Sequence, residues 1–446
     1  MTMIKRSFVI LVWLFLAAAV YGQVKVARLD IKERTLANGL HVVSLRDNTS
    51  PTVAIHVWYN VGGKNDPVGK SGFAHMFEHM MFKSTKNMPN EKMDRLTEDV
   101  GGFNNASTWD DFTNYYEVVP SNYLETLLWA EAERMANLNV DDTNFASERD
   151  VVKEEYRQSV LAQPYGRFNE YIGSLSYAVH PYKRGVIGDL AQLDAATSAD
   201  ARAFHELYYR PDNAYLIVVG DFDETQFNGW TDKYFGKLTK PTSTIPRVTD
   251  VEPDRTKETR YAKTAPNVPF PAVAITYLGP KTDDADIPAL NVAEKILSEG
   301  ESSRLYQSLV YKQQIAQDAS FTVDLKVDRC LLYFSATASE GHTAEEQEKA
   351  LLAQLKLIQT TGVTPNELTK AKNQLIAEAV RSREDNDGKA GEIERAIAYQ
   401  HDPKSVNNDI QRLQAVTAAA VLRVMKKYFR DNNRVVIYYS NDGGAK

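Results

Sequence analysis

Cysteine is nearly absent from this sequence: Cys330 is the single example among 446 residues. One cysteine excludes an intramolecular disulfide, so the fold must be stabilised by a hydrophobic core or by a metal rather than by covalent cross-links. Cys330 lies in the apolar segment "DRCLLYFSATA", where we expect it to be a small buried side chain.

Long hydrophobic runs are also scarce, and the clearest one is in the N-terminal "MTMIKRSFVILVWLFLAAAVYGQ". Lys5 and Arg6 precede this run, and the small pair Val20 and Gly22 suits a cleavage site before Gln23. The alternative is a membrane anchor, but the run is shorter than the roughly 20 residues that span a bilayer. We therefore expect a cleaved signal peptide over residues 1–22, no stable membrane anchor, and an exported protein that is periplasmic or secreted.

Positive charge is not concentrated in any segment. The 52 Lys and Arg residues are outnumbered by 59 Asp and Glu residues, and the net charge is −7. Without a basic stripe interleaved with aromatic residues, nucleic acid is not an expected partner. A hydrophobic fraction of 43% and a charged fraction of 25% are typical of a soluble globular protein, and this length favours two or three domains, of which we expect two.

Local patterns predict an α+β fold. Strands are expected in "RTLANGLHVVSLRD", around its Asn-Gly turn, in "TVAIHVWYNVGG" and in "FNNASTWDDFTNYYEVVP". Periodic apolar residues predict helices over 73–83, 93–100, 121–137, 143–162 and 199–209, followed by a buried strand in "NAYLIVVGDF". We expect an antiparallel-rich sheet with helices packed on one face.

The second half of the sequence repeats the first. The segment "ELYYRPDNAYLIVV" at 206–219 matches "KKYFRDNNRVVIYY" at 426–439, and "VDDTNFASERDVVKEE" from Val140 matches "VTPNELTKAKNQLIAE" from Val363. Similar offsets at two places indicate a duplicated domain. The proline-containing "KLTKPTSTIPRVTDVEPDRTK" between the halves is typical of a linker. We expect an N-terminal domain at 23–240, a linker at 241–257 and a homologous C-terminal domain at 258–446.

The motif "HMFEH" carries the chemistry of the first half. On a helix, His75 and His79 lie one turn apart on the same face, and Glu78 borders that face. Such a pair can bind zinc, whose catalytic sites use three protein ligands and leave the fourth position to water. Zinc lowers the pKa of that water to roughly 7, and Glu78 could accept its proton as general base.

The alternative is a core helix with two hydrogen-bonded histidines. Burying Glu78 and two imidazoles among Phe and Met residues costs several kcal/mol unless something compensates them, which favours the metal. A third ligand is needed, and "ERDVVKEEYRQ" at 148–158 offers candidates. From composition alone, either Glu154 or Glu155 could be this ligand, and Glu148 lies on the same helical face as Glu155. A solvated charged face remains the simpler interpretation of all three.

These features together resemble one family. The "HMFEH" motif, the later acidic helix, the segment "GGFNNA" at 101–106 and the duplicated α+β domain are similar to the pitrilysin/insulinase family of inverted-motif zinc metallopeptidases. The short two-domain form is most similar to the mitochondrial processing peptidase and its bacterial relatives.

The resemblance implies roles for individual residues. His75, His79 and Glu155 would bind one Zn²⁺ per chain, Glu78 would be the catalytic base and Glu148 a supporting acidic group. A strand containing Asn105 and Ala106 would hold the peptide backbone by strand addition. His180, in "YAVHPYKRGVIG", is expected to be structural. Independently of the resemblance, the histidines of the second half, His342 and His401, are far apart and not in a ligand spacing, so we expect no metal in the C-terminal domain.

The sequence departs from the family in "SSRLYQSLVYKQQIAQDASF". Relatives carry there an arginine followed by a tyrosine that reach over the bound peptide, at positions that correspond approximately to Tyr311 and Gln317. We therefore expect a heterodimer in which a homologous metal-free subunit supplies the Arg/Tyr pair. The expected function is an exported zinc endopeptidase that hydrolyses unfolded peptides. The alternative is a non-catalytic structural or assembly subunit of the same fold.

Overall fold

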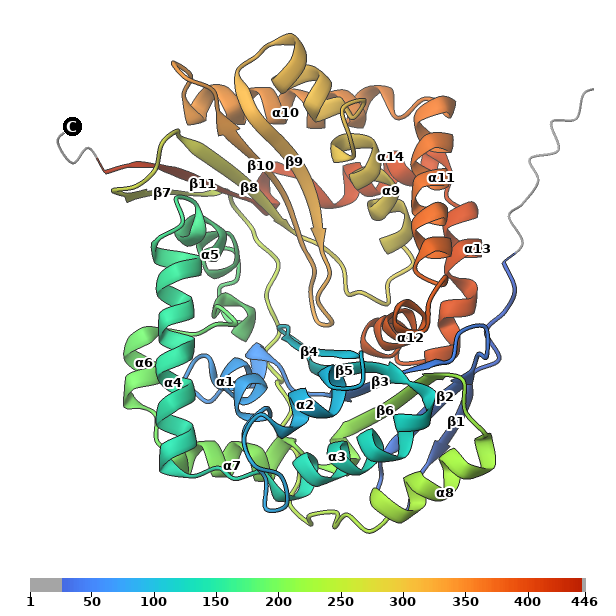
Figure 1. Cartoon of the computed structure of the whole chain (residues 1–446). Helices are drawn as coiled ribbons and strands as arrows, with labels where there is room; N and C mark the ends of the chain where they lie inside the picture. Colours follow the sequence, from blue (N-terminus) through green and yellow to red (C-terminus); the bar gives the residue numbers. More distant parts are fainter. Residues whose placement is uncertain (1–25, 443–446) are drawn as a thin grey trace, which may run out of the picture.

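The computed structural model describes residues 26–442, so the predicted signal peptide lies outside the described residues. The chain forms two sheets, each with its own layer of helices, and the second sheet lies above the first in Figure 1. Among the helices within 26–442, none is both long enough and apolar enough to cross a bilayer.

The first sheet has six strands, in the order β1-β2-β6-β3-β5-β4. Only β2 and β6 run parallel, and every other neighbouring pair is antiparallel. The strands are β1 (Lys32–Thr35), β2 (His41–Arg46), β3 (Thr52–Tyr59), β4 (Phe103–Thr108), β5 (Thr113–Pro120) and β6 (Ala214–Gly220). The turn between β1 and β2 requires Gly39, because its φ of 95° is in the left-handed region that favours glycine.

One face of this sheet is covered by helices of the first half. Their apolar residues and those of the sheet form one buried cluster that includes Phe73, Leu127 and Phe204. The helices are α1 (Phe73–Met80), α2 (Lys92–Glu98), α3 (Leu124–Asn137), α4 (Asp142–Tyr156), α6 (Leu190–Ala195), α7 (Ser198–Tyr208) and α8 (Glu224–Tyr234). The predicted helix 143–162 is shorter than expected as an α-helix, because its last turns, Arg157–Leu161, form a π-helix.

The second sheet has five strands, in the order β7-β11-β8-β10-β9, and again one parallel pair, β7 with β11. The strands are β7 (Thr259–Ala265), β8 (Ala272–Leu278), β9 (Ala316–Asp324), β10 (Leu331–Ala338) and β11 (Arg434–Asn441). The helices of this half are α9 (Ile287–Ser298), α10 (Ala344–Thr361), α11 (Pro365–Arg381), α12 (Asn386–Gln400), α13 (Asp409–Gln414) and α14 (Ala418–Tyr428).

This arrangement repeats that of the first half. Strands β2, β6, β3, β5 and β4 correspond in order and direction to β7, β11, β8, β10 and β9. The side-chain amide of Asn213 donates to the Tyr208 carbonyl, and that of Asn433 donates to the Tyr428 carbonyl. The predicted α+β fold with a duplicated domain is confirmed.

The other face of each sheet is covered by a helix from the opposite half, which the sequence patterns did not predict. Ile393 and Ile397 of α12 pack on Trp58 and Ile217 of the first sheet. In return, Phe168 of α5 (Gly166–Ser174) stacks on Tyr439 of the second sheet, with ring centroids 5.3 Å apart. Each half therefore completes the core of the other.

A buried polar cluster also joins the halves. The loop between β9 and β10 contacts the loop between β4 and β5: Lys326 pairs with Asp110, and the Val327 amide donates to Asp111. Lys64 bridges Asp111 and Asp328 at 2.8 and 3.1 Å. His180 is fully buried, 3.3 Å from Asp328, in the same cluster, which is a structural position.

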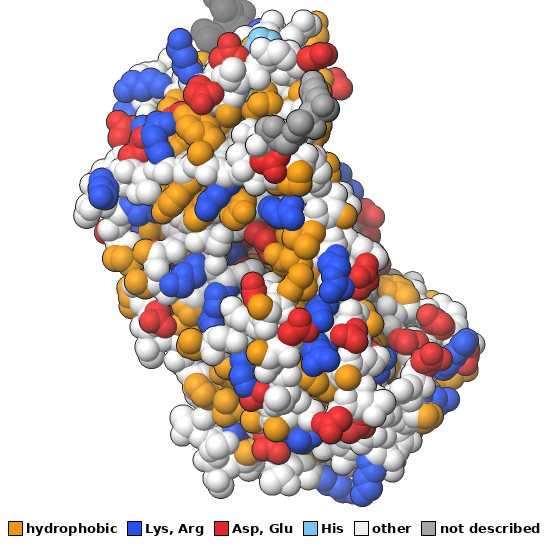
Figure 2. All heavy atoms as spheres, turned by 90° about the vertical axis from the view of Figure 1, so that its left-hand side faces the viewer, with side chains coloured by type: hydrophobic (Ala, Val, Ile, Leu, Met, Phe, Trp, Pro, Cys, Tyr) orange, Lys and Arg blue, Asp and Glu red, His pale blue; other side chains and the backbone are white. Residues whose placement is uncertain are grey.

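Residues 241–257 contain no helix or strand and run between the two sheets. They are nevertheless fixed at several points. Arg210 donates to the carbonyls of Pro241 and Ser243, and the buried Glu252 carboxylate accepts hydrogen bonds from the backbone amides of residues 178–180. The domain boundaries at 240 and 258 stay a prediction. Over the described residues visible in Figure 2, basic and acidic side chains are interspersed, without a continuous basic area.

Candidate functional site

The helix that carries "HMFEH" is fixed at its start by a buried carboxylate. Asp66 accepts hydrogen bonds from the backbone amides of Gly72 (2.6 Å) and Ala74 (2.8 Å), so it satisfies donors that a helix start leaves free. Gly72 has φ 98°, and a Cβ there would lie 2.8 Å from a backbone oxygen. The apolar side of α1 is fully buried through Phe73, Met76, Phe77 and Met80. Helix α1 is thus held at its start and along its core face.

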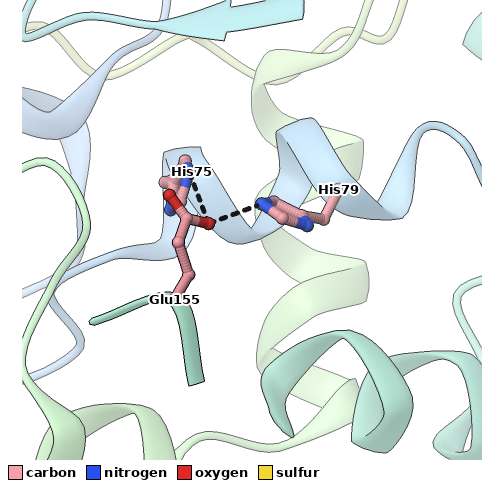
Figure 3. Close-up of side chains that lie close together, drawn as sticks. All are labelled: His75, His79 and Glu155. Carbon is pink, nitrogen blue, oxygen red and sulfur yellow. Dashed lines mark ion pairs between the residues drawn. The ribbon is translucent and has the colours of Figure 1, made fainter. Parts of the chain in front are cut away.

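The two histidines lie on the opposite side of α1, as a helical spacing of four requires. Their rings are 4.9 Å apart, and their side chains are 11% and 22% exposed. Figure 3 shows both rings directed at one carboxylate, that of Glu155 on α4. A Glu155 oxygen, Oε2, lies 3.7 Å from His75 Nε2 and 3.3 Å from His79 Nε2.

The three acidic candidates of α4 occupy different environments. Glu155 is next to both imidazoles, whereas Glu154 is exposed and contacts Arg157 and Gln158. Glu148 lies on the other side of His79, 3.7 Å from its Nδ1, and is fixed by Lys83 at 2.6 Å. The structure therefore separates the two glutamates that composition could not distinguish.

The donor atoms fit a tetrahedral metal. In the described part of the chain, His75, His79 and Glu155 are the group of His, Cys, Asp or Glu residues whose ligand atoms, all within 4.8 Å of one another, could hold an ion. Ligands at zinc distances of about 2.0–2.2 Å are separated by about 3.4 Å at tetrahedral angles. The observed separations of 3.3 and 3.7 Å match that spacing. Two imidazoles and a carboxylate are also a ligand set that zinc accepts.

The electrostatics of the two histidines differ. Burial, together with His79, lowers the pKa of His75 to about 4, so its imidazole is neutral and has a free lone pair at neutral pH. Burial also lowers the pKa of His79, but Glu148 and Glu155 outweigh it and raise that pKa to about 9. A metal must therefore displace a proton from His79.

Glu78 lies between the two histidines in sequence, beside a residue that the sequence patterns did not indicate. This residue is Thr108, at the end of β4. Burial raises the pKa of Glu78, and the nearby hydroxyl and backbone amide of Thr108 oppose the rise. A carboxylate with a raised pKa is better matched to accept and return a proton near neutral pH.

The strand β4 also contains Asn105 and Ala106. Asn105 is exposed, and its side-chain oxygen accepts a hydrogen bond from the Ala106 amide at 2.8 Å. Ala106 is 7% exposed and belongs to the core under the sheet, so it has only its backbone to offer to a ligand. Both residues lie on an edge strand that borders α1.

The second half contains a counterpart of this site that the sequence reasoning missed. The segment "NVAEK" at 291–295 occupies in α9 the position of "HMFEH" in α1, and Glu378 of α11 corresponds to Glu155. Glu294 accepts a hydrogen bond from the Val323 amide on β9, just as Glu78 lies beside Thr108 on β4. Lys295 replaces the second histidine and pairs with Glu378 at 2.9 Å. Aligning the two halves helix by helix would have found this signal.

The positions expected for the missing Arg/Tyr pair lie in the second half. Tyr311 is 66% exposed and belongs to the π-helix Tyr306–Lys312. Gln317 is exposed near the start of β9. Neither side chain is packed into the core of its own chain.

Comparison with known proteins identifies the family. Residues 41–189 match the family model "Insulinase (Peptidase family M16)", and residues 195–375 match "Peptidase M16 inactive domain". The zinc protease PqqE of Helicobacter pylori is 31% identical over 407 residues, which cover 91% of each chain.

Solved structures show the same fold. The crystal structure of a protease from Helicobacter pylori is 31% identical, has a TM-score of 0.90 and covers 93% of this chain and 100% of its own. A peptidase M16 inactive domain from Pseudomonas fluorescens, 18% identical, has a TM-score of 0.83 and covers 94% and 99%. The chain described here belongs to the insulinase family of peptidases, peptidase family M16.

Proposed function

We propose that this chain is an exported zinc-dependent endopeptidase that hydrolyses unfolded peptides. The observation that carries the proposal is the position of Glu155 Oε2, within 3.3 and 3.7 Å of the Nε2 atoms of His79 and His75. Glu78 lies on the same helix, within the motif, and beside Thr108. A relative named as a zinc protease, 31% identical over most of the chain, supports this assignment.

The residues of the site would have separate roles. His75, His79 and Glu155 would hold Zn²⁺, which supplies a Lewis acid and a water of lowered pKa when bound. Glu78 would accept the proton of the attacking water on its carboxylate and then pass it to the nitrogen of the leaving amine. Glu148, whose carboxylate lies 3.7 Å from His79 Nδ1, would attract that side of the ring and so keep Nε2 directed at the metal.

An extended peptide fits the edge of the first sheet. Among the described residues β4 has one neighbouring strand, β5, and a substrate could pair with its other side once the Ala106 amide is released from the Asn105 side chain. Thr108, at the end of this strand, lies beside Glu78, so a peptide paired with β4 would pass beside the base. Asn105 and Ala106 would contribute to the backbone pairing.

The partner is also a proposal. We infer that a homologous metal-free subunit supplies an Arg/Tyr pair over the site. This chain has Tyr311 and Gln317 at the positions where relatives carry that pair, so it does not supply the pair itself. The purified chain alone should then cleave peptides slowly and gain activity with the partner co-purified from its native host. Full activity of the chain alone as a monomer or homodimer contradicts the heterodimer but leaves the peptidase assignment intact.

Replacing Glu78 by Gln tests the peptidase assignment. General acid–base catalysis contributes about 10²–10⁴-fold, so Glu78→Gln should lower the rate of peptide cleavage by at least about 100-fold. Zinc content, measured by inductively coupled plasma mass spectrometry, should remain one per chain. Equal cleavage by wild type and variant would overturn the assignment.

Export is tested separately. Mass spectrometry of the exported protein should find Gln23 at the N-terminus.

The second candidate function is a non-catalytic assembly subunit of the same fold. The family model matched by residues 195–375 is described as inactive, and the second half has Lys295 in a ligand position. The complete set His75, Glu78, His79 and Glu155 in the first half favours the enzyme. Zinc-free protein without peptidase activity, purified together with its partner, would favour the assembly subunit.

A further inference from the structure

The four edge strands of the two sheets differ in charge. Among the described residues, three of these strands carry charged side chains, which protect an exposed edge from pairing with another chain. These are Lys32, Glu33 and Arg34 on β1, Arg260 and Lys263 on β7, and Asp318 and Asp324 on β9. The fourth, β4, has the sequence "FNNAST" and carries no charge. β4 is therefore the edge that is not protected against pairing.

The side chains of β4 alternate between two faces of the sheet, as strand geometry requires. Asn104 donates to Thr97 of α2, Ala106 is in the core below the sheet, and Thr108 lies beside Glu78. These even-numbered residues thus face the helices. Phe103, which is odd-numbered, faces the opposite side. Trp109 directly follows β4 and continues the alternation: its amide donates to the Phe112 carbonyl, and its ring centroid is 6.2 Å from that of Phe112.

Both of these aromatic side chains are unusually accessible. Phe103 is 47% exposed and Trp109 is 54% exposed, and in the described part of the chain Tyr311 is the other aromatic residue among the exposed large hydrophobics. An exposed Phe or Trp forgoes the free energy that burial would provide, so one at the start of an unprotected strand and one directly after its end indicate a binding surface. Between them on the same face lie only the polar Asn105 and Ser107.

We propose that Phe103 and Trp109 determine substrate specificity by binding large apolar side chains of the extended peptide that pairs with β4. The two residues are six positions apart, or about 20 Å along a strand. Because cross-strand neighbours lie on the same face, the selected substrate side chains are also six positions apart. This inference rests on the proposed peptidase function and names the substrate class of that site: unfolded segments with apolar residues at both positions.

The test is a cleavage profile from a proteome-derived peptide library, with the cut sites located by mass spectrometry. The zinc-loaded wild type should prefer Phe, Leu, Ile, Met or Trp at two positions six residues apart. Phe103→Ser should abolish the preference at one position and Trp109→Ser at the other. For a synthetic peptide, each substitution should lower the ratio of kcat/KM between the apolar peptide and its Ser-substituted form by about tenfold.

Leu357→Ser is the matched control, because Leu357 is an equally exposed hydrophobic residue (43%) on α10 of the second half. It should leave both preferences unchanged. Profiles that Phe103→Ser and Trp109→Ser do not alter, in an enzyme that still depends on Glu78, would overturn the inference and leave the peptidase function standing.

A binding assay tests the specificity proposal even if the peptidase function fails. If the wild type cleaves nothing, the peptidase function fails, and the same peptides can be tested for binding to the Glu78→Gln chain by fluorescence polarisation. Phe103→Ser and Trp109→Ser, each introduced into that chain, should then weaken binding of the apolar peptide about tenfold. Unchanged binding would overturn the specificity assignment independently of catalysis.

Discussion

The Nζ atom of Lys295 lies 2.9 Å from a carboxylate oxygen of Glu378. The two residues face each other across α9 and α11, as His79 and Glu155 do across α1 and α4. The second half thus keeps the carboxylate of the site and neutralises it with an ammonium of its own. A fixed lysine satisfies Glu378 without an ion from solution.

Replacing Lys295 should therefore destabilise the chain without changing its metal content. Glu378 is 40% exposed, so solvent screens the pair, and Lys295→Met should lower the free energy of unfolding by only about 1 kcal/mol. Urea denaturation measures this loss. The matched control is Lys349→Met, since Lys349 is exposed on α10. Equal losses in both variants would show that the ion pair contributes nothing.

Glu155→Gln should weaken zinc binding more than any neighbouring substitution. It removes one of the three proposed protein ligands, so the loss should exceed the 10–100-fold that supporting residues contribute. Competition with a chelator of known affinity measures it. Glu154→Gln is the control, because Glu154 is exposed and pairs with Arg157. The zinc affinity of this variant should equal that of the wild type. The opposite result would reverse the roles of the two glutamates.

Glu148→Gln should have an intermediate effect. Glu148 lies 3.7 Å from His79 Nδ1, on the side of the ring away from Glu155, so we expect it to orient and polarise the imidazole. Zinc affinity should fall about 10–100-fold. In the metal-free protein, the pKa of His79 should also fall from about 9, which NMR titration of the ring protons would detect. A fall in affinity with an unchanged His79 pKa would point to a general loss of structure instead.

His56 should make stability depend on pH at alkaline values. It is buried on β3, with Nδ1 2.9 Å from Glu394 and Nε2 3.1 Å from Asp387, both on α12, and its ring lies 5.4 Å from Tyr116. Burial lowers the pKa of His56, but the two carboxylates outweigh it and raise the pKa to about 9. Since the folded pKa exceeds the unfolded value, the stabilisation is complete below about pH 6.5 and is lost as the pH rises through about 9.

The size of this stability change follows from the difference between the folded and unfolded pKa values of His56. The stability difference between wild type and His56→Gln should shrink by about 3 kcal/mol between pH 6 and pH 10. Comparing the two proteins at each pH cancels other titrating groups. A difference that stays constant over this range would show that His56 is neutral in the folded chain.

The sequence predicted those parts of the structure that depend on local periodicity. The spacing of His75, Glu78 and His79 indicated one helical face, and α1 has that face. The Asn-Gly turn and the alternating strands were also found where expected. Each of these features is determined by side chains within a few residues of one another.

Contacts between distant segments were not predictable in this way. Composition left Glu154 and Glu155 open, and only the packing of α4 on α1 separates them. Thr108 was inconspicuous because its role depends on β4 lying beside α1. The family resemblance supplied Glu155 from other proteins; neither composition nor helical periodicity distinguished it.

The helices that cover the opposite sheets have a further consequence. α5 and α12 begin at residues 166 and 386, the same offset that separates residues 210 and 430 in the repeated segments. They are therefore equivalent elements, and each packs on the sheet of the opposite half. The two halves are related as the subunits of a domain-swapped dimer whose chains have been joined end to end. A chain cut between residues 240 and 258 should give fragments that aggregate when expressed apart and reassemble when expressed together.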